Sequence, residues 1–324
     1  MGILNVKLLS TSSCFKGRKV ATAELVKKAC PDREAKEIIE KVGIENRYWI
    51  DDETTLADLS AEALEIAIDE SGIKKESIER VILATSMGAD CLVPATVNAV
   101  LEKLNLPTTC DGFDLNNACM GYLTALDIAS RSVATGSGPV AVVAAEISSR
   151  FLSPEASRSY LVMADGAIGT IVGRADDSSK ILASCFGNNG NQRHTVTLAH
   201  PQLTTKQEYI HFNENNKEIS ELALSTLKNN VEAMLKETGL TPEDINWVVP
   251  HQPNGRIFNR LIDLLDFSED KYVKIVDQYG SLGCASVACG FHFLRKEKKV
   301  QKGDKILMAG VGAGLSFGAM IYQV

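Results

Sequence analysis

The chain has 324 residues, of which 45% are hydrophobic and 23% charged, and its formal net charge is -7. This is the composition of a globular protein with a large buried core, and the acidic balance argues against binding nucleic acid through its phosphates. The longest purely apolar run, 140–145, is too short to span a bilayer, and the first ten residues lack a signal peptide's apolar stretch. We therefore expect a cytoplasmic protein that contacts neither nucleic acid nor membrane.

The eight cysteines are scattered, and no two of them form a C-x-x-C pair. In a chain of this length without a secretion signal, such cysteines are typically reduced. The five histidines do not cluster with them at the spacing of a zinc site. The sequence predicts free thiols and no bound metal or other cofactor.

Two segments far apart in the chain predict the same order of elements. The first is an amphipathic helix at 57–71, ended by Gly72 and followed by a strand at 80–85. The second is an amphipathic helix at 218–238, followed by a strand at 247–250. The two segments align at a constant offset, because 239 − 72 for the glycines that end the helices and 245 − 78 for two isoleucines both equal 167.

The correspondence continues in two apolar strand patterns, at 137–146 and 302–311. Each is followed by a segment of small residues, at 164–172 and 312–320. Nearly continuous apolar strands that alternate with helices are typical of α/β layers in which the strands are buried on both faces. The sequence therefore predicts two similar α/β halves. Coincidence between two ordinary helix-turn-strand units is the alternative.

A polar segment rich in Gly and Asn separates the predicted halves. We expect an N-terminal half at 1–173, a connecting insertion of irregular structure at 174–216, and a C-terminal half at 217–324. No low-complexity or Pro-rich linker lies between the halves, so we expect them to share one compact body.

Cys119 stands at a predicted junction between a strand and a helix, in the segment GFDLNNACMGY, and a helical pattern of small apolar residues runs over 118–132. A thiol at the start of a helix faces unpaired backbone N–H groups and the positive end of the helix dipole, which lower its pKa and favour the thiolate. The same N–H groups can hold the oxyanion of an acyl-transfer intermediate. A small buried core residue is the other interpretation of a free cysteine.

His251 directly follows the predicted strand at 247–250, and Pro250 and Pro253 end the pairing of that strand. The ends of buried strands are where α/β proteins commonly carry catalytic groups. Three other histidines fall in the predicted insertion, and His292 falls on a predicted helix. A hydrogen-bonded structural histidine is the alternative role for His251.

Two glycine-rich segments follow. The segment 277–290 (DQYGSLGCASVACG) predicts a loop that enters a tightly packed helix, with Ser281 in the loop; a helix N-cap is the other interpretation of this serine. The segment 310–318 (GVGAGLSFG) predicts a turn after a strand. It lacks the lysine and the downstream acid of a nucleotide site, so we expect its backbone N–H groups to approach an acyl oxygen.

These four segments, in this order and at this spacing, resemble the condensing enzymes of the thiolase superfamily, and most closely the β-ketoacyl-acyl-carrier-protein synthase III type. FDLNNACMGY is similar to the nucleophile segment, PHQPNGRI to the histidine segment and GAGLSFG to the terminal glycine loop, and the likeness extends from about Gly43 to the C-terminus. The resemblance implies a thiolase-like α/β fold, in which two duplicated α/β halves form a layered α-β-α-β-α body, and a dimer.

The resemblance also implies roles for individual residues. Cys119 would take an acyl group from a thioester of coenzyme A or of an acyl-carrier protein, and His251 would act as base or hydrogen-bond donor. The backbone N–H groups of Cys119 and Gly314 would support the oxyanion. Asn254 and Arg256 match positions near the pantetheine arm or the acidic carrier protein.

Two departures from the family pattern bear on the chemistry. Ser281, which we count among the catalytic residues, replaces the asparagine that donates to the enolate oxygen when a malonyl thioester loses carbon dioxide. Losing one oxyanion donor costs on the order of 100- to 1,000-fold in rate, so full decarboxylation is in doubt. Glu37 and Lys41 stand where members that stack the adenine of coenzyme A have a tryptophan and an arginine. A carrier protein or another thioester is therefore the alternative donor.

The leading hypothesis is an acyltransferase that condenses an acyl group with a malonyl-type or β-keto carbon nucleophile in specialised fatty-acid or polyketide-type biosynthesis. In the main alternative, His251 deprotonates an alcohol or amine that attacks the acyl-cysteine and forms an ester or amide. A partner subunit of a heteromeric synthase and a hydrolase are further alternatives. We expect a homodimer, with a heteromer as the alternative, and an acyl-pocket wall that includes residues 87–93.

Overall fold

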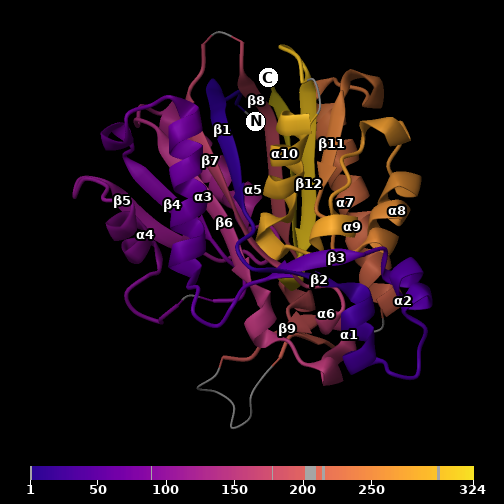
Figure 1. The fold of residues 1–324 in the computed structure, drawn as a ribbon. Coiled ribbons are helices and arrows are strands. Elements are labelled where there is room, and N and C mark those ends of the chain that lie inside the picture. Colours follow the sequence, from indigo (N-terminus) through magenta and orange to yellow (C-terminus); the bar gives the residue numbers. More distant parts are fainter. Residues whose placement is uncertain (1, 89, 177, 201–208, 214–215, 298–299) are drawn as a thin grey trace.

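The computed structural model describes residues 2–88, 90–176, 178–200, 209–213, 216–297 and 300–324. Two sheets form its centre (Figure 1). The N-terminal sheet has the order β1 (Val6–Cys14), β7 (Asp165–Arg174), β6 (Val140–Ile147), β4 (Arg80–Ala84) and β5 (Asp111–Leu115). The C-terminal sheet, taken in the same direction, has the order β8 (Lys180–Asn188), β13 (Ser316–Gln323), β12 (Lys305–Gly312) and β11 (Trp247–Pro250).

The two sheets share one pairing scheme, which confirms the predicted duplication. β4 pairs with β6 in parallel, and β7 pairs antiparallel with both β6 and β1. In the other half β11 pairs with β12 in parallel, and β13 pairs antiparallel with both β12 and β8. Gly72 and Gly239, which end the two aligned helices, have left-handed φ values of 72° and 70° that favour glycine.

Helices alternate with the sheets to give five layers. α5 (Gly121–Ala134) and α10 (Ser286–Glu297) pack between the sheets, and their apolar side chains share one core with strands of both. α3 (Leu56–Ser71) and α4 (Val97–Lys103) cover the outer face of the N-terminal sheet. α7 (Asn216–Thr238) and α8 (Gly255–Leu264) cover the outer face of the C-terminal sheet. The structure therefore has the predicted α-β-α-β-α order (Figure 1).

Shorter elements gather at the end of the sheets opposite the chain termini (Figure 1). They are β2 (Arg18–Ala21), α1 (Thr22–Ala29), α2 (Ala35–Val42), β3 (Asn46–Trp49), α6 (Ser157–Tyr160), β9 (Val196–Thr197), β10 (His211–Phe212) and α9 (Val276–Tyr279). No helix within the described ranges is long and apolar enough to cross a membrane.

The expected connecting insertion at 174–216 needs a correction. Nine of its residues form β8, which pairs along its length with β13 and is the counterpart of β1. The second half therefore begins before residue 217. The Gly/Asn-rich run that predicted irregular structure begins only at the end of β8, at Gly187 and Asn188, whereas the preceding residues 181–186 are mostly apolar.

Candidate active site

Cys119 lies in a tight turn between β5 and α5. The helix begins at Gly121, three residues after the predicted start at 118 (121 − 118 = 3), because the chain first makes a turn. Ala118 has a left-handed φ of 46°, and its N–H donates to Asn116 Oδ1 at 3.0 Å. Non-glycine residues with such φ values collect at functional sites, where the surrounding structure holds them. The turn presents the thiol just ahead of the helix.

The environment of Cys119 differs from the one expected. Burial raises the pKa of its thiol to about 12, and the negative charge of Glu146 adds to this rise. The backbone N–H groups of Ala313 and of Cys119 itself act in the opposite direction, as a helix start should, but they do not offset the loss of solvation. The expectation of a lowered pKa is therefore wrong, and the group is a thiol at neutral pH.

His251 stands at the end of β11, where its backbone N–H donates to Ala309 of the neighbouring strand β12 at 2.8 Å. Its side chain is 5% exposed, and its Nδ1 has no partner among the described residues. Burial lowers the pKa of this imidazole to about 4. It is therefore neutral at physiological pH and can either accept a proton or donate a hydrogen bond.

Gln252 fixes the chain directly after His251 and was not singled out from the sequence. It is fully buried, and its Nε2 donates to the carbonyl of Val273 at 2.7 Å. Its Oε1 accepts from the N–H groups of Ile275 and Val276 at 2.9 and 3.1 Å. A polar residue between two prolines at a strand end is the signal that could have identified it.

The end of β12 approaches both candidate groups. A Cβ placed on Gly312 would lie 2.9 Å from the backbone N of Cys119 and 3.2 Å from its Cβ. A Cβ placed on Gly310 would lie 3.0 Å from Met120 Sδ and 3.2 Å from the Cβ of His251. The turn of Cys119 and the histidine thus lie against two glycines of one strand, separated by a single residue.

Gly314 follows the end of this strand, whereas Ser281 lies against the segment 162–164. Gly314 has a φ of 128°, which favours glycine, but the backbone group that lowers the pKa of Cys119 is that of its neighbour Ala313. Ser281 is 4% exposed; its N–H donates to Val162 at 2.8 Å and its carbonyl accepts from Ala164 at 2.9 Å. It is not an N-cap, because α10 begins only at Ser286.

Asn254 and Arg256 belong to the start of α8. Asn254 is the N-cap, and its Oδ1 accepts from the N–H of Ile257 at 2.9 Å. Arg256 is exposed in the first turn. Between them, a Cβ placed on Gly255 would lie 2.7 Å from the backbone of Gly43, so α8 begins against the end of α2. Asn254 thus has a structural role, as a helix N-cap, in addition to the binding role that the resemblance implies.

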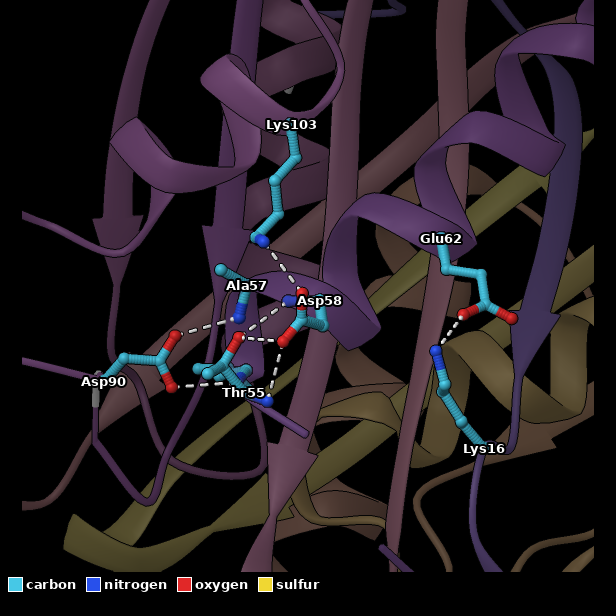
Figure 2. A network of polar contacts seen from close by, with 8 residues as sticks. Lys16, Thr55, Ala57, Asp58, Glu62, Asp90 and Lys103 are labelled. Atoms are coloured by element: carbon cyan, nitrogen blue, oxygen red, sulfur yellow. Dashed lines mark hydrogen bonds and ion pairs between the residues drawn. The ribbon is translucent and has the colours of Figure 1, made fainter. Parts of the chain in front are cut away.

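The loop expected to line the acyl pocket is firmly anchored. Both carboxylate oxygens of Asp90 accept from the first N–H groups of α3, at Leu56 and Ala57, at 2.8 and 2.9 Å (Figure 2). Beyond this anchor the side chains of Leu92 and Val93 are exposed, with relative accessibilities of 68% and 86%. Of the predicted wall 87–93, residue 89 lies outside the described residues.

All eight cysteines are free thiols, as predicted. Within the described part of the chain, no group of three or more His, Cys, Asp or Glu side chains is arranged to hold a metal ion.

Two family models match the segments in which the candidate residues lie. The family model described as 3-oxoacyl-[acyl-carrier-protein (ACP)] synthase III matches residues 113–190, which include Cys119. The model described as the C-terminal part of the same enzyme matches 235–324, which include His251 and Ser281. The two matched segments therefore contain Cys119 and His251, which lie against Gly312 and Gly310 of β12.

Whole-chain similarities extend beyond these segments. The β-ketoacyl-[acyl-carrier-protein] synthase III of Clostridium acetobutylicum is 30% identical over 98% of this chain and 98% of its own. That of Aliarcobacter butzleri is 31% identical over 88% of each chain. The crystal structure of 3-oxoacyl-[acyl-carrier-protein] synthase III from Aquifex aeolicus VF5 superposes with a TM-score of 0.90 at 28% identity, covering 98% of this chain and all of that one. The chain therefore belongs to the β-ketoacyl-[acyl-carrier-protein] synthase III family of acyl-thioester condensing enzymes, within the thiolase superfamily.

Proposed function

We propose that this protein loads an acyl group from coenzyme A or an acyl-carrier protein onto Cys119 and transfers it to a malonyl-type or β-keto carbon nucleophile in specialised fatty-acid or polyketide-type biosynthesis. The observation that carries this proposal is the approach of Gly310 and Gly312 to His251 and Cys119, because it sets a thiol and a neutral imidazole at one strand end. Both groups are therefore available for the same acyl centre.

In the first step, the sulfur of Cys119 attacks the thioester carbonyl carbon. The thiol proton passes to His251, a bond forms from sulfur to the acyl carbon, and the donor's carbon–sulfur bond breaks. The leaving thiolate takes the proton from the imidazole, so the histidine returns to its neutral form. The backbone N–H groups of Cys119 and Gly314 are the proposed donors to the oxyanion. In support, the neighbouring backbone N–H of Ala313 lowers the pKa of Cys119, as a donor that faces the sulfur should.

In the second step, a neutral His251 suits the role of hydrogen-bond donor to an enolate oxygen. Its pKa of about 4 keeps it uncharged across the physiological range, so an N–H remains available without competing protonation. Ser281 offers a hydroxyl from a shorter side chain in place of the amide expected in the family. We propose that this donor is weaker and that decarboxylation is slower for that reason.

The second candidate reaction is acyl transfer to an alcohol or amine, and Ser281 is the observation that favours it. Attack by an alcohol or amine forms no enolate, so it does not need the second donor. His251 would take the proton of the acceptor as its oxygen or nitrogen bonds to the acyl carbon. The two reactions differ in a measurable by-product, since only condensation with a malonyl thioester releases carbon dioxide.

A carrier protein is the donor that surface charge favours. Glu37 forms an ion pair with Arg33 on the exposed face of α2, in the region where the family's adenine-stacking side chains would stand. Arg158 lies with its guanidinium 3.8 Å from the centre of the Phe212 ring, and burial and Arg256 together lower its pKa to about 10. Two mutually repelling arginines at this end of the molecule suit the phosphate of a pantetheine arm or an acidic partner.

A homodimer is the proposed assembly. β5 is an edge strand of the N-terminal sheet and leads into the Cys119 turn, and the anchored loop beside it exposes Leu92 and Val93. Exposed apolar side chains on a fixed loop favour burial against another chain. Light scattering of the purified protein gives its mass in solution, and co-purification from its host distinguishes a heteromer.

The proposal is tested by incubating the protein with a panel of acyl-coenzyme A and acyl-carrier-protein donors. We expect intact-mass spectrometry and peptide mapping to find one acyl group on Cys119, and carbon dioxide and a β-keto product to appear when malonyl thioester is added. Acylation without carbon dioxide, followed by an ester or amide product, would select the second reaction. A Cys119 that no donor acylates would overturn both, and free acid formed faster than any transfer product would indicate a hydrolase.

A further inference from the structure

Glu146 is a buried carboxylate that the proposed reaction does not use. It lies near the end of β6 in the N-terminal half and is 0% exposed, and burial raises its pKa. Among the described residues, the groups that hydrogen-bond its carboxylate belong to Ser86 and Cys284, and neither carries a positive charge. A carboxylate in such a place normally needs a function or a full set of hydrogen bonds to offset its loss of solvation.

The hydrogen bonds of Glu146 come from two different halves of the molecule. The backbone N–H of Ser86 donates to its two oxygens at 3.2 and 3.3 Å, and the Ser86 hydroxyl also donates to Oε1. From the C-terminal half, the N–H of Cys284 donates to Oε1 at 2.9 Å. Three donors favour the ionised form. A Cβ placed on Gly283 would lie 2.6 Å from Oε1, so this turn requires glycine to meet the carboxylate.

A chain of hydrogen bonds leads from Glu146 to the nucleophile turn. Glu146 holds Ser86, and the carbonyl of Ser86 accepts from Asn116 Nδ2 at 3.5 Å. Asn116 Oδ1 in turn accepts from the N–H of Ala118 at 3.0 Å. Ala118 is the left-handed residue directly before Cys119, so the carboxylate supports the backbone that presents the thiol.

Cys284, which donates to Glu146, also contacts two elements of the N-terminal half. A Cβ placed on Gly121, at the start of α5, would lie 3.1 Å from the Cβ of Cys284, and the Cys284 thiol donates to the carbonyl of Ala84 at 3.3 Å. Three residues earlier in the chain, Ser281 forms a bridge with Met163. The segment 281–285 is therefore fastened at one end to this bridge and at the other to Glu146.

We propose that Glu146 is a positioning residue, which holds the turn before Cys119 and the turn after Ser281 in one fixed arrangement. This inference rests on the proposed function, in which Cys119 is the nucleophile. Burial is the larger cause of the raised pKa of the Cys119 thiol, and the charge of the carboxylate adds to it. Burial also raises the pKa of the Cys284 thiol, and Glu146 and Cys119 both add to that rise. Glu146 thus adds to the burial that keeps Cys119 a thiol.

The test compares Glu146→Gln with wild type and with Asp165→Asn as a matched control. Asp165 is also a buried carboxylate of the N-terminal half, 1% exposed, but its side-chain hydrogen bonds with described residues come from Ile50 and Ser149 rather than from the turn of Cys119. Removing the charge in Glu146→Gln should lower the pKa of Cys119, so that iodoacetamide alkylates it at pH 8 about threefold faster for each unit of that fall, because a less nucleophilic sulfur partly offsets the larger thiolate fraction. The site of alkylation is assigned by peptide mapping.

Acyl transfer provides the second readout. We expect kcat of Glu146→Gln to fall by about 10- to 100-fold, with KM for the acyl donor unchanged, because the turns lose their fixed relation. Asp165→Asn should lower the melting temperature but leave the pH profile of Cys119 alkylation unchanged. If Glu146→Gln does not fold, Glu146→Asp keeps the charge and shortens its reach, and we expect a lower kcat at an unchanged thiol pKa.

The inference would be overturned if Glu146→Gln had the alkylation profile of wild type and if its kcat and melting temperature changed no more than those of Asp165→Asn. Glu146 would then be an ordinary structural residue. A wild-type kcat in folded Glu146→Asp would do the same. Failure of the proposed function is a different outcome, because Cys119 would then remain unacylated in the wild-type protein whatever Glu146 does to its alkylation.

Discussion

The sharpest prediction concerns the strand end that approaches Cys119. Gly312→Ala adds one methyl group 2.9 Å from the backbone N of Cys119, about half an ångström inside ordinary van der Waals contact. Gly312 has an extended φ of -133°, so alanine fits the backbone and the perturbation is purely steric. Overpacking of this kind costs about 1–3 kcal/mol of unfolding free energy, and moving a reacting group by about 1 Å costs about 100-fold in rate.

Alanine substitutions at two further glycines should give smaller effects on activity. At Gly310 the added methyl meets the flexible end of Met120 as well as His251, so Gly310→Ala should lose less activity than Gly312→Ala. At Gly190 nothing lies within 4 Å, so Gly190→Ala is the matched control and should behave as wild type. The assay follows acylation of Cys119 by mass spectrometry over time and unfolding in urea. Equal acylation rates in Gly312→Ala and Gly190→Ala would refute the close approach on which the site is built.

Three other predictions follow from the site. Ser281→Asn should raise carbon dioxide release from malonyl thioester by at least about tenfold, measured with labelled substrate, and no rise would show that the missing amide is not limiting. The pKa of His251 is lowered to about 4 in the folded protein, so only the unfolded chain takes up a proton at this group as the pH falls below 6.5. The free energy of unfolding should therefore fall by about 2 kcal/mol between pH 7 and pH 5 because of this group. Urea unfolding of His251→Gln should lack that loss. If the unfolding free energy of His251→Gln fell with pH as steeply as that of wild type, the buried neutral imidazole would be contradicted. Arg256→Glu should raise KM for an acyl-carrier protein by about tenfold at unchanged kcat, and the effect should shrink in high salt; equal KM values would exclude Arg256 from carrier binding.

The sequence determined the repeated architecture of this protein and the identity of its candidate groups. The aligned helices, their terminal glycines and the strands after them are local patterns, fixed by apolar periodicity and by the left-handed turns that glycine permits, so they could be read without tertiary contacts. The positions of Cys119 and His251 at element ends follow from the same patterns. β8 escaped prediction because its pairing with β13 spans more than a hundred residues of chain, and because the Gly/Asn-rich run that begins at its last residues drew the whole segment into the predicted insertion.

Only the tertiary structure decided the electrostatics and the supports of the site. The helix start beside Cys119 predicted a lowered pKa, but burial, which depends on every layer packed around the thiol, raises the pKa instead. Glu146 acts through partners that are distant in the sequence, so no local pattern marks it, and the prolines beside Gln252 indicate a strand end but not its buried partners. A short stretch of chain specifies its own turns and helices, whereas solvation and long-range hydrogen bonds exist only once the two halves have packed together.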